Sequence, residues 1–95
     1  MNLEVIKDYL KIDFNEDDGV LEMLLGSARK YLIAAVGCES LDETDERVKI
    51  ALLALISDWY EHREYVGDSS PKVRYTIRSI VLQLQCEQEA DEHEN

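Results

Sequence analysis

The chain has 95 residues, enough for one small domain, and a net charge of −11 from 21 acidic and 10 basic residues. This balance argues against binding to nucleic acid or to anionic lipid, because both require a basic surface. No run of about 18 uninterrupted apolar residues is present, so we expect no membrane span. A domain this small buries only about 60–65% of its unfolded surface, so self-association would add useful burial.

The two cysteines, Cys38 and Cys86, lie far apart in the sequence. The chain does not start with a basic segment followed by a long apolar run, so we expect no secretory signal. Cysteines in such a chain are expected to be reduced. We therefore expect an intracellular protein with two free thiols.

Apolar spacing predicts a first helix over residues 3–11, with Asn2 as its N-cap. A second helix is expected over residues 16–36, with Asn15 as its cap and Gly37 as its end. Gly26 lies inside this second helix at a cost of about 1 kcal/mol relative to Ala. The expected compensation is a close helix crossing at that glycine.

A third helix is expected over residues 43–66, with Asp42 or Thr44 as its cap and Gly67 as its end. Its first half is apolar on most sides, which is typical of a helix surrounded by neighbours. Its last turns change to packed aromatic and charged residues, from Trp59 to Glu64. The third helix is therefore predicted to hold the core and to end in a contact surface.

Ser70 followed by Pro71 predicts the start of a fourth helix, which we expect to reach about Gln88. No segment alternates between apolar and polar residues as a strand would. The predicted fold is all-α, a small bundle of about four helices with two long antiparallel helices. Residues 1–86 form the helical domain, and residues 87–95 are expected to be an acidic, disordered tail.

Two patterns suggest chemistry, and both lack necessary partners. Residues 13–19 resemble the opening of a calcium-binding loop, but Asp18 stands where that loop needs Gly and Leu24 where it needs Glu. Asp58 and His62 are four residues apart and would share a helix face, yet the only other histidine lies in the acidic tail. We therefore expect no catalytic, metal or cofactor site, and read the pair as solvated or as part of an interface.

The end of the third helix has the composition of a protein contact, since aromatic residues and arginine are enriched in such surfaces. Trp59 could equally be a core residue. The fourth helix begins with a basic cluster that only Tyr75 accompanies, so a protein contact or an internal ion pair is favoured over nucleic acid. The candidate interface residues are Trp59, Tyr60, Arg63, Tyr65, Lys72, Arg74 and Arg78.

Three segments, residues 5–13, 17–32 and 52–67, carry a resemblance to a known family. The first contains Lys7, Leu10, Ile12 and Asp13. The second begins with Asp17 and Asp18 and continues to Ala28, Arg29 and Tyr31. The third contains the order Trp59 to Glu64, which no helix period requires. On the basis of these three segments, the chain resembles the small head–tail connector (adaptor) proteins of long-tailed phages and prophages. That family is often labelled with a suggested role in DNA packaging.

The resemblance implies a structural role in which no cofactor or membrane takes part. Such proteins form a ring, usually of twelve copies, beneath the portal at the capsid vertex. The ring extends the channel for double-stranded DNA and receives the head-closure or tail proteins. Acids facing the channel would let DNA pass without sequence-specific binding. The implied locations are the head–tail junction of the virion and, during assembly, the host cytoplasm.

The chain departs from the family in its acidic C-terminal residues, where many relatives stop or carry a basic residue. Two alternatives stay open at this point. One is an acidic regulator or DNA mimic that binds a host DNA-binding enzyme. The other is an enzyme that uses Asp58 and His62.

Overall fold

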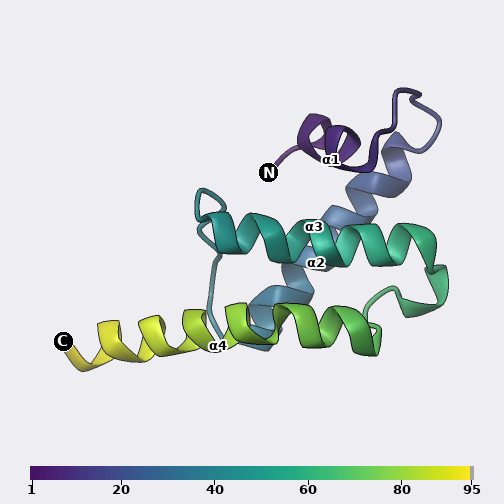
Figure 1. The fold of residues 1–95 in the computed structure, drawn as a ribbon. Coiled ribbons are helices and arrows are strands. Elements are labelled where there is room, and N and C mark those ends of the chain that lie inside the picture. Colours follow the sequence, from purple (N-terminus) through teal and green to yellow (C-terminus); the bar gives the residue numbers. More distant parts are fainter. Residues whose placement is uncertain (95) are drawn as a thin grey trace.

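The computed structural model describes the backbone of residues 1–94 and the side chains of residues 1–88. This part of the chain contains only helices and turns, so the predicted all-α fold is confirmed. The elements are α1 (Leu3–Leu10), α2 (Asp18–Val36), α3 (Glu46–Glu61), the 3₁₀ turn η1 (Arg63–Tyr65) and α4 (Pro71–Glu94). α3 and α4 run antiparallel side by side, α2 crosses behind them, and α1 packs against α2 and α3 (Figure 1).

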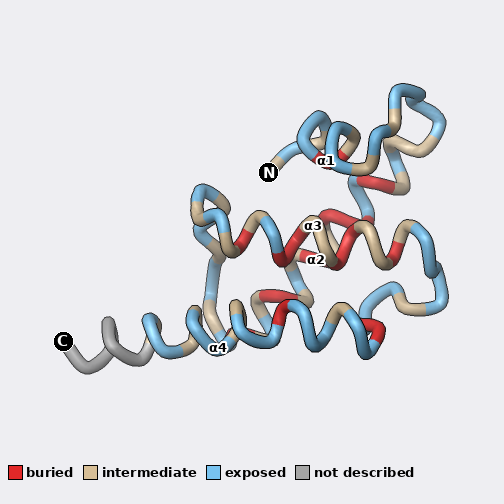
Figure 2. Tube along the Cα trace, viewed as in Figure 1, coloured by how far each residue is buried: buried red, intermediate tan, exposed pale blue. Residues whose placement is uncertain are grey.

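The core lies mainly between α2 and α3, which supply most of the buried side chains (Figure 2). α1 adds Ile6, which is fully buried. Among the described side chains of α4, only Ile77 is buried. α3 is therefore the central helix, as its apolar sequence predicts, and α4 covers one side of the core while most of its own surface stays open to solvent.

The start of α2 differs from the prediction. The helix begins at Asp18 with Asp17 at the N-cap position, two residues later than expected. Asn15 does not cap it, because the Asn15 Oδ1 accepts a hydrogen bond from the Lys7 Nζ at 2.7 Å. The expected C-terminal end of α2 and the expected N-cap of α1 are confirmed. Gly37 ends α2 in the left-handed conformation at φ 79°, and Asn2 accepts from the Val5 N–H.

Both ends of α3 also differ from the prediction. Asp45 is the N-cap and accepts from the Arg47 N–H at 2.9 Å, so neither Asp42 nor Thr44 has that role. Asp42 instead accepts from the Thr44 N–H in the preceding turn. At the other end the helix stops after Glu61, because His62 adopts a non-helical backbone (φ −129°, ψ 82°). The expected continuous helix to Val66 is replaced by η1.

α4 begins at Pro71 as predicted, and the Ser70 Oγ accepts from the Val73 N–H at 3.3 Å. Two of its glutamines bind the end of α2. The Gln85 Nε2 donates to the Ala35 carbonyl at 3.1 Å, and the Gln88 Nε2 donates to the Gly37 carbonyl at 2.9 Å. The helix continues to Glu94, past the expected end. The disordered tail over residues 87–95 stays a prediction, since the side chains from residue 89 and all of residue 95 lie outside the described part.

Gly26 does not have the close helix crossing that the sequence suggested. A Cβ built on it would meet no atom within 4 Å outside its own helix turn, so this position faces open space in the single chain. Cys38 and Cys86 are both free, as expected. None of the helices over residues 1–94 combines the length and apolar character that crossing a bilayer requires.

Candidate assembly interface

The turn between α3 and α4 is fastened by side chains from two helices. The Trp59 indole is fully buried, and its Nε1 donates to the Asp68 carbonyl. Its ring meets Tyr31 of α2 edge-on, with centroids 5.9 Å apart. The Tyr31 hydroxyl in turn lies 2.8 Å from the Oγ of buried Ser69. The structure thus decides between the two interpretations of Trp59. It is a core residue that fixes the turn and offers no surface to another chain.

Asp58 and His62 do not form a pair of side chains acting together. The Asp58 carboxylate accepts from the Ser70 hydroxyl at 3.1 Å, which ties α3 to the first turn of α4. His62 is exposed and lies edge-on to Tyr65. Within the described residues no three His, Cys, Asp or Glu side chains converge as metal ligands would. This arrangement gives Asp58 a structural role at a helix start.

Tyr60 and Arg63 lie next to each other at the end of α3. The Tyr60 hydroxyl donates to the Asp17 carboxylate, and this bond raises the pKa of Tyr60 above its ordinary value. The Arg63 guanidinium lies 5.6 Å from the centre of the Tyr60 ring, within the range of a cation–π contact. Arg63 is exposed, whereas Tyr65 is half-buried. Arg63 is therefore the candidate at this end with most of its surface free.

The three basic candidates of α4 differ in their surroundings. Arg74 donates to the Asp68 carboxylate at 3.3 Å and to the Ser69 carbonyl at 3.1 Å, so it holds the preceding turn. Lys72 and Arg78 are exposed, and neither forms an ion pair with a described side chain. The seven sequence candidates therefore differ in exposure, and two of them, Trp59 and Arg74, are engaged within the chain.

One surface was missed from the sequence, the outer side of α4. Tyr75 is 82% exposed and Leu82 is 50% exposed, although both are large apolar residues. Together with Arg78 and Ser79 they form a surface that we call the α4 face. These four residues also line an open groove of about 840 Å³ between α4 and the start of α3. Residues 75, 79 and 82 recur at helical spacing on one side of α4, and this spacing was the available signal. They lie outside the main apolar stripe of the helix, which consists of Val73, Ile77, Ile80, Val81 and Leu84.

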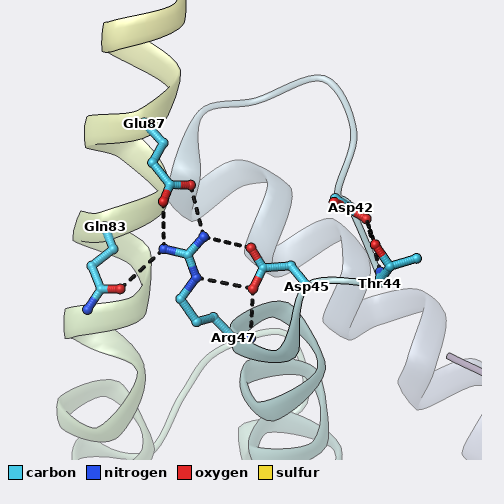
Figure 3. Close-up of polar contacts among 6 residues, drawn as sticks. All are labelled: Asp42, Thr44, Asp45, Arg47, Gln83 and Glu87. Atoms are coloured by element: carbon cyan, nitrogen blue, oxygen red, sulfur yellow. Dashed lines mark hydrogen bonds and ion pairs between the residues drawn. The ribbon is translucent and has the colours of Figure 1, made fainter.

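Arg47 is the residue of α3 that lines this groove, and Figure 3 shows the side chains that hold it. Its guanidinium is held by Asp45 and by Glu87 of α4, with N···O distances of 2.6 Å to Asp45 and 2.9 Å to Glu87. Gln83 accepts from the same guanidinium at 3.2 Å. Hydrogen bonds from Arg47 lower the pKa of both carboxylates, and the Arg47 pKa is raised in return. The groove is thus lined by the fixed guanidinium of Arg47 and by the apolar side chains of Tyr75 and Leu82.

Comparison with known proteins points to one family. The family model described as phage gp6-like head–tail connector protein matches residues 1–87. No curated protein and no solved structure shows a significant match. The match covers α1, α2, α3 and most of α4, and it ends at Glu87, which binds Arg47. The chain therefore belongs to the phage gp6-like head–tail connector family, a family of structural, non-enzymatic proteins that assemble with portal and tail proteins at the head–tail junction of the virion.

Proposed function

We propose that copies of this chain form a ring, usually twelve-fold in such proteins, between the portal and the tail of a phage particle. The ring extends the channel for double-stranded DNA and receives the head-closure or tail proteins. The observation that carries the proposal is the family match over residues 1–87. The all-α fold and the unburied apolar surface of α4 support it, since a ring subunit needs such surfaces to contact its neighbours.

The charge of the chain also supports a channel role. Each subunit carries −11, and DNA phosphates are repelled by a wall of the same sign. Five of the ten basic residues have acidic partners in the same chain, as Arg29 has in Glu43 and Lys7 in Asp18. A channel lined by such a surface would let DNA pass without holding it.

The decisive experiment is electron microscopy of the protein alone and mixed with its portal protein. We expect rings, or a ring-shaped layer added to the portal. Such rings can require the portal as a template, so the mixture is the more important sample. If neither sample ever shows a ring or a complex with the portal, the proposal is wrong.

Arg63 is proposed to contact the portal or a neighbouring subunit. Its side chain is exposed, and its internal contacts are the Tyr60 ring and a 3.3 Å hydrogen bond to the Tyr60 carbonyl. Arg63→Ala should therefore change the unfolding free energy by less than about 1 kcal/mol while impairing assembly. Lys30→Ala is the matched control, since it removes the same charge from an exposed position on α2. Normal ring and particle yields with folded Arg63→Ala would show that Arg63 is not a contact residue.

A further inference from the structure

The α4 face (Tyr75, Arg78, Ser79 and Leu82) combines apolar area with positive charge. Both of its apolar members are exposed, Tyr75 more than any other large apolar residue among the described side chains, and they line the 840 Å³ groove. From Pro71 to Cys86 the sequence has three basic residues and no acidic residue, within a chain of net charge −11. The sides of α4 that point away from the core are pale blue in Figure 2. The α4 face is therefore suited to a partner that is apolar and acidic.

The start of α2 has the complementary properties. Met23 is 74% exposed and Phe14 is 44% exposed, so this end also leaves large apolar side chains in water. Glu16 and Glu22, which are close to them in the sequence, are also exposed, and neither forms an ion pair with a described basic side chain. We call these four residues the α2 patch. One turn further along the helix is Gly26, where a second chain would meet no Cβ.

A second acidic stretch, residues 39–46, fits the α4 face less well. Glu43 is bound by Arg29 at 2.8 Å and Asp45 by Arg47 at 2.6 Å, so two of its charges are already neutralised within the chain. Its exposed side chains include no large apolar residue. Charge and apolar exposure together therefore favour the α2 patch over residues 39–46.

We propose that the α4 face of one copy binds the α2 patch of the next copy. This inference rests on the proposed ring and names the surfaces that build it. The start of α2 and α4 lie at opposite edges of the molecule in Figure 1, so one chain cannot satisfy both surfaces by itself. Because the two surfaces differ, the contact is head-to-tail and repeats from copy to copy until a ring closes. Arg78 meets the acids of the neighbour, while Leu82 and Tyr75 pack against Met23 and Phe14.

Thiol cross-linking tests this contact directly. In a chain with Cys38→Ser and Cys86→Ser, one cysteine replaces Ser79 and a second replaces Met23. A short bismaleimide then joins thiols of neighbouring copies without demanding disulfide geometry. We expect a ladder of trimers and larger products on a denaturing gel, because each copy has one reactive position on each contact surface. The matched control replaces Lys30 instead of Met23, on the same side of α2 but about 10 Å further along.

A charge exchange provides a second measurement. Arg78→Glu should lower the yield of cross-linked ladder about five- to tenfold, since it places like charges opposite each other. Adding Glu22→Lys to that chain should restore most of the yield. A ladder that is equally strong with the Lys30 control, a product that stops at dimers, or an Arg78→Glu chain that cross-links normally would each overturn the proposed contact.

The ring itself is examined on the same samples by electron microscopy with the portal protein. Rings without the specific ladder would refute this contact and leave the connector function standing. If Arg78→Glu also abolished portal binding, the α4 face would instead be assigned to the contact with the portal. A specific ladder without any ring or portal complex would have the opposite consequence for the two proposals. It would establish the head-to-tail contact and refute the proposed function.

Discussion

Replacing Trp59 by alanine should remove a large part of the stability of this domain. The side chain is fully buried, meets Tyr31 edge-on and donates a hydrogen bond to the Asp68 carbonyl. Truncating a buried tryptophan costs about 3–5 kcal/mol, a range that includes the lost packing and the cavity. A 95-residue domain has a total unfolding free energy of about 5–14 kcal/mol. Trp59→Ala should therefore remove between about a fifth and all of it.

The assay is urea unfolding followed by far-UV circular dichroism, which does not depend on the lost indole fluorescence. Trp59→Phe keeps an aromatic ring and loses the hydrogen bond, so it should cost about 1–2 kcal/mol and stay measurable if the alanine variant does not fold. Tyr75→Ala is the control on an 82% exposed aromatic residue and should cost less than about 0.5 kcal/mol. Equal costs for Trp59→Ala and Tyr75→Ala would refute the assignment of Trp59 as the anchor of the core.

Three further predictions concern the acid limb of stability, a tyrosine titration and a helix glycine. The hydrogen bond from Arg29 lowers the pKa of Glu43 below its ordinary value of 4.5, so the stability it provides is complete above that pH and is lost as the pH falls through the lowered value. Glu43→Gln should flatten this part of the curve of unfolding free energy against pH, and two superimposable curves would contradict the ion pair. The bond to Asp17 raises the pKa of Tyr60 above 10.0, so in Asp17→Asn an absorbance titration should show that tyrosine ionising at lower pH; an unchanged titration would exclude the bond. Gly26→Ala should stabilise the single chain by about 0.5–1 kcal/mol, because a Cβ there meets no atom, and a loss of stability in urea would show that the position is crowded.

The helices could be predicted because their apolar spacing and end signals are local. Ser70 and Pro71 start α4 as expected, since a capping hydroxyl and a proline act within one turn. The break after Glu61 could not be predicted in the same way. Trp59 binds the Asp68 carbonyl across the turn, a contact nine residues away that apolar spacing does not encode. That contact draws the chain back toward the core before the expected helix end.

The interface was harder to predict than the fold, because exposure depends on which sides of a helix are covered. The sequence marked Trp59 and Arg74 as contact candidates, but the first is buried and the second is bound to the turn before α4. Apolar spacing gave no indication that Tyr75 and Leu82 form a contact surface, because they lie outside the main apolar stripe of α4. Only the packing of α4 on α2 and α3 shows that their side of the helix is left open.

The two glutamines of α4 that bind the end of α2 have a consequence for the order of events during synthesis. Gln85 and Gln88 lie 50 and 51 residues after the carbonyls that they bind. A chain emerging from the ribosome can therefore form α2 and pack it on α3 while these carbonyls still bind water. The C-terminus of α2 gains these partners only after α4 has been synthesised. The fourth helix thus completes the hydrogen bonding of the second.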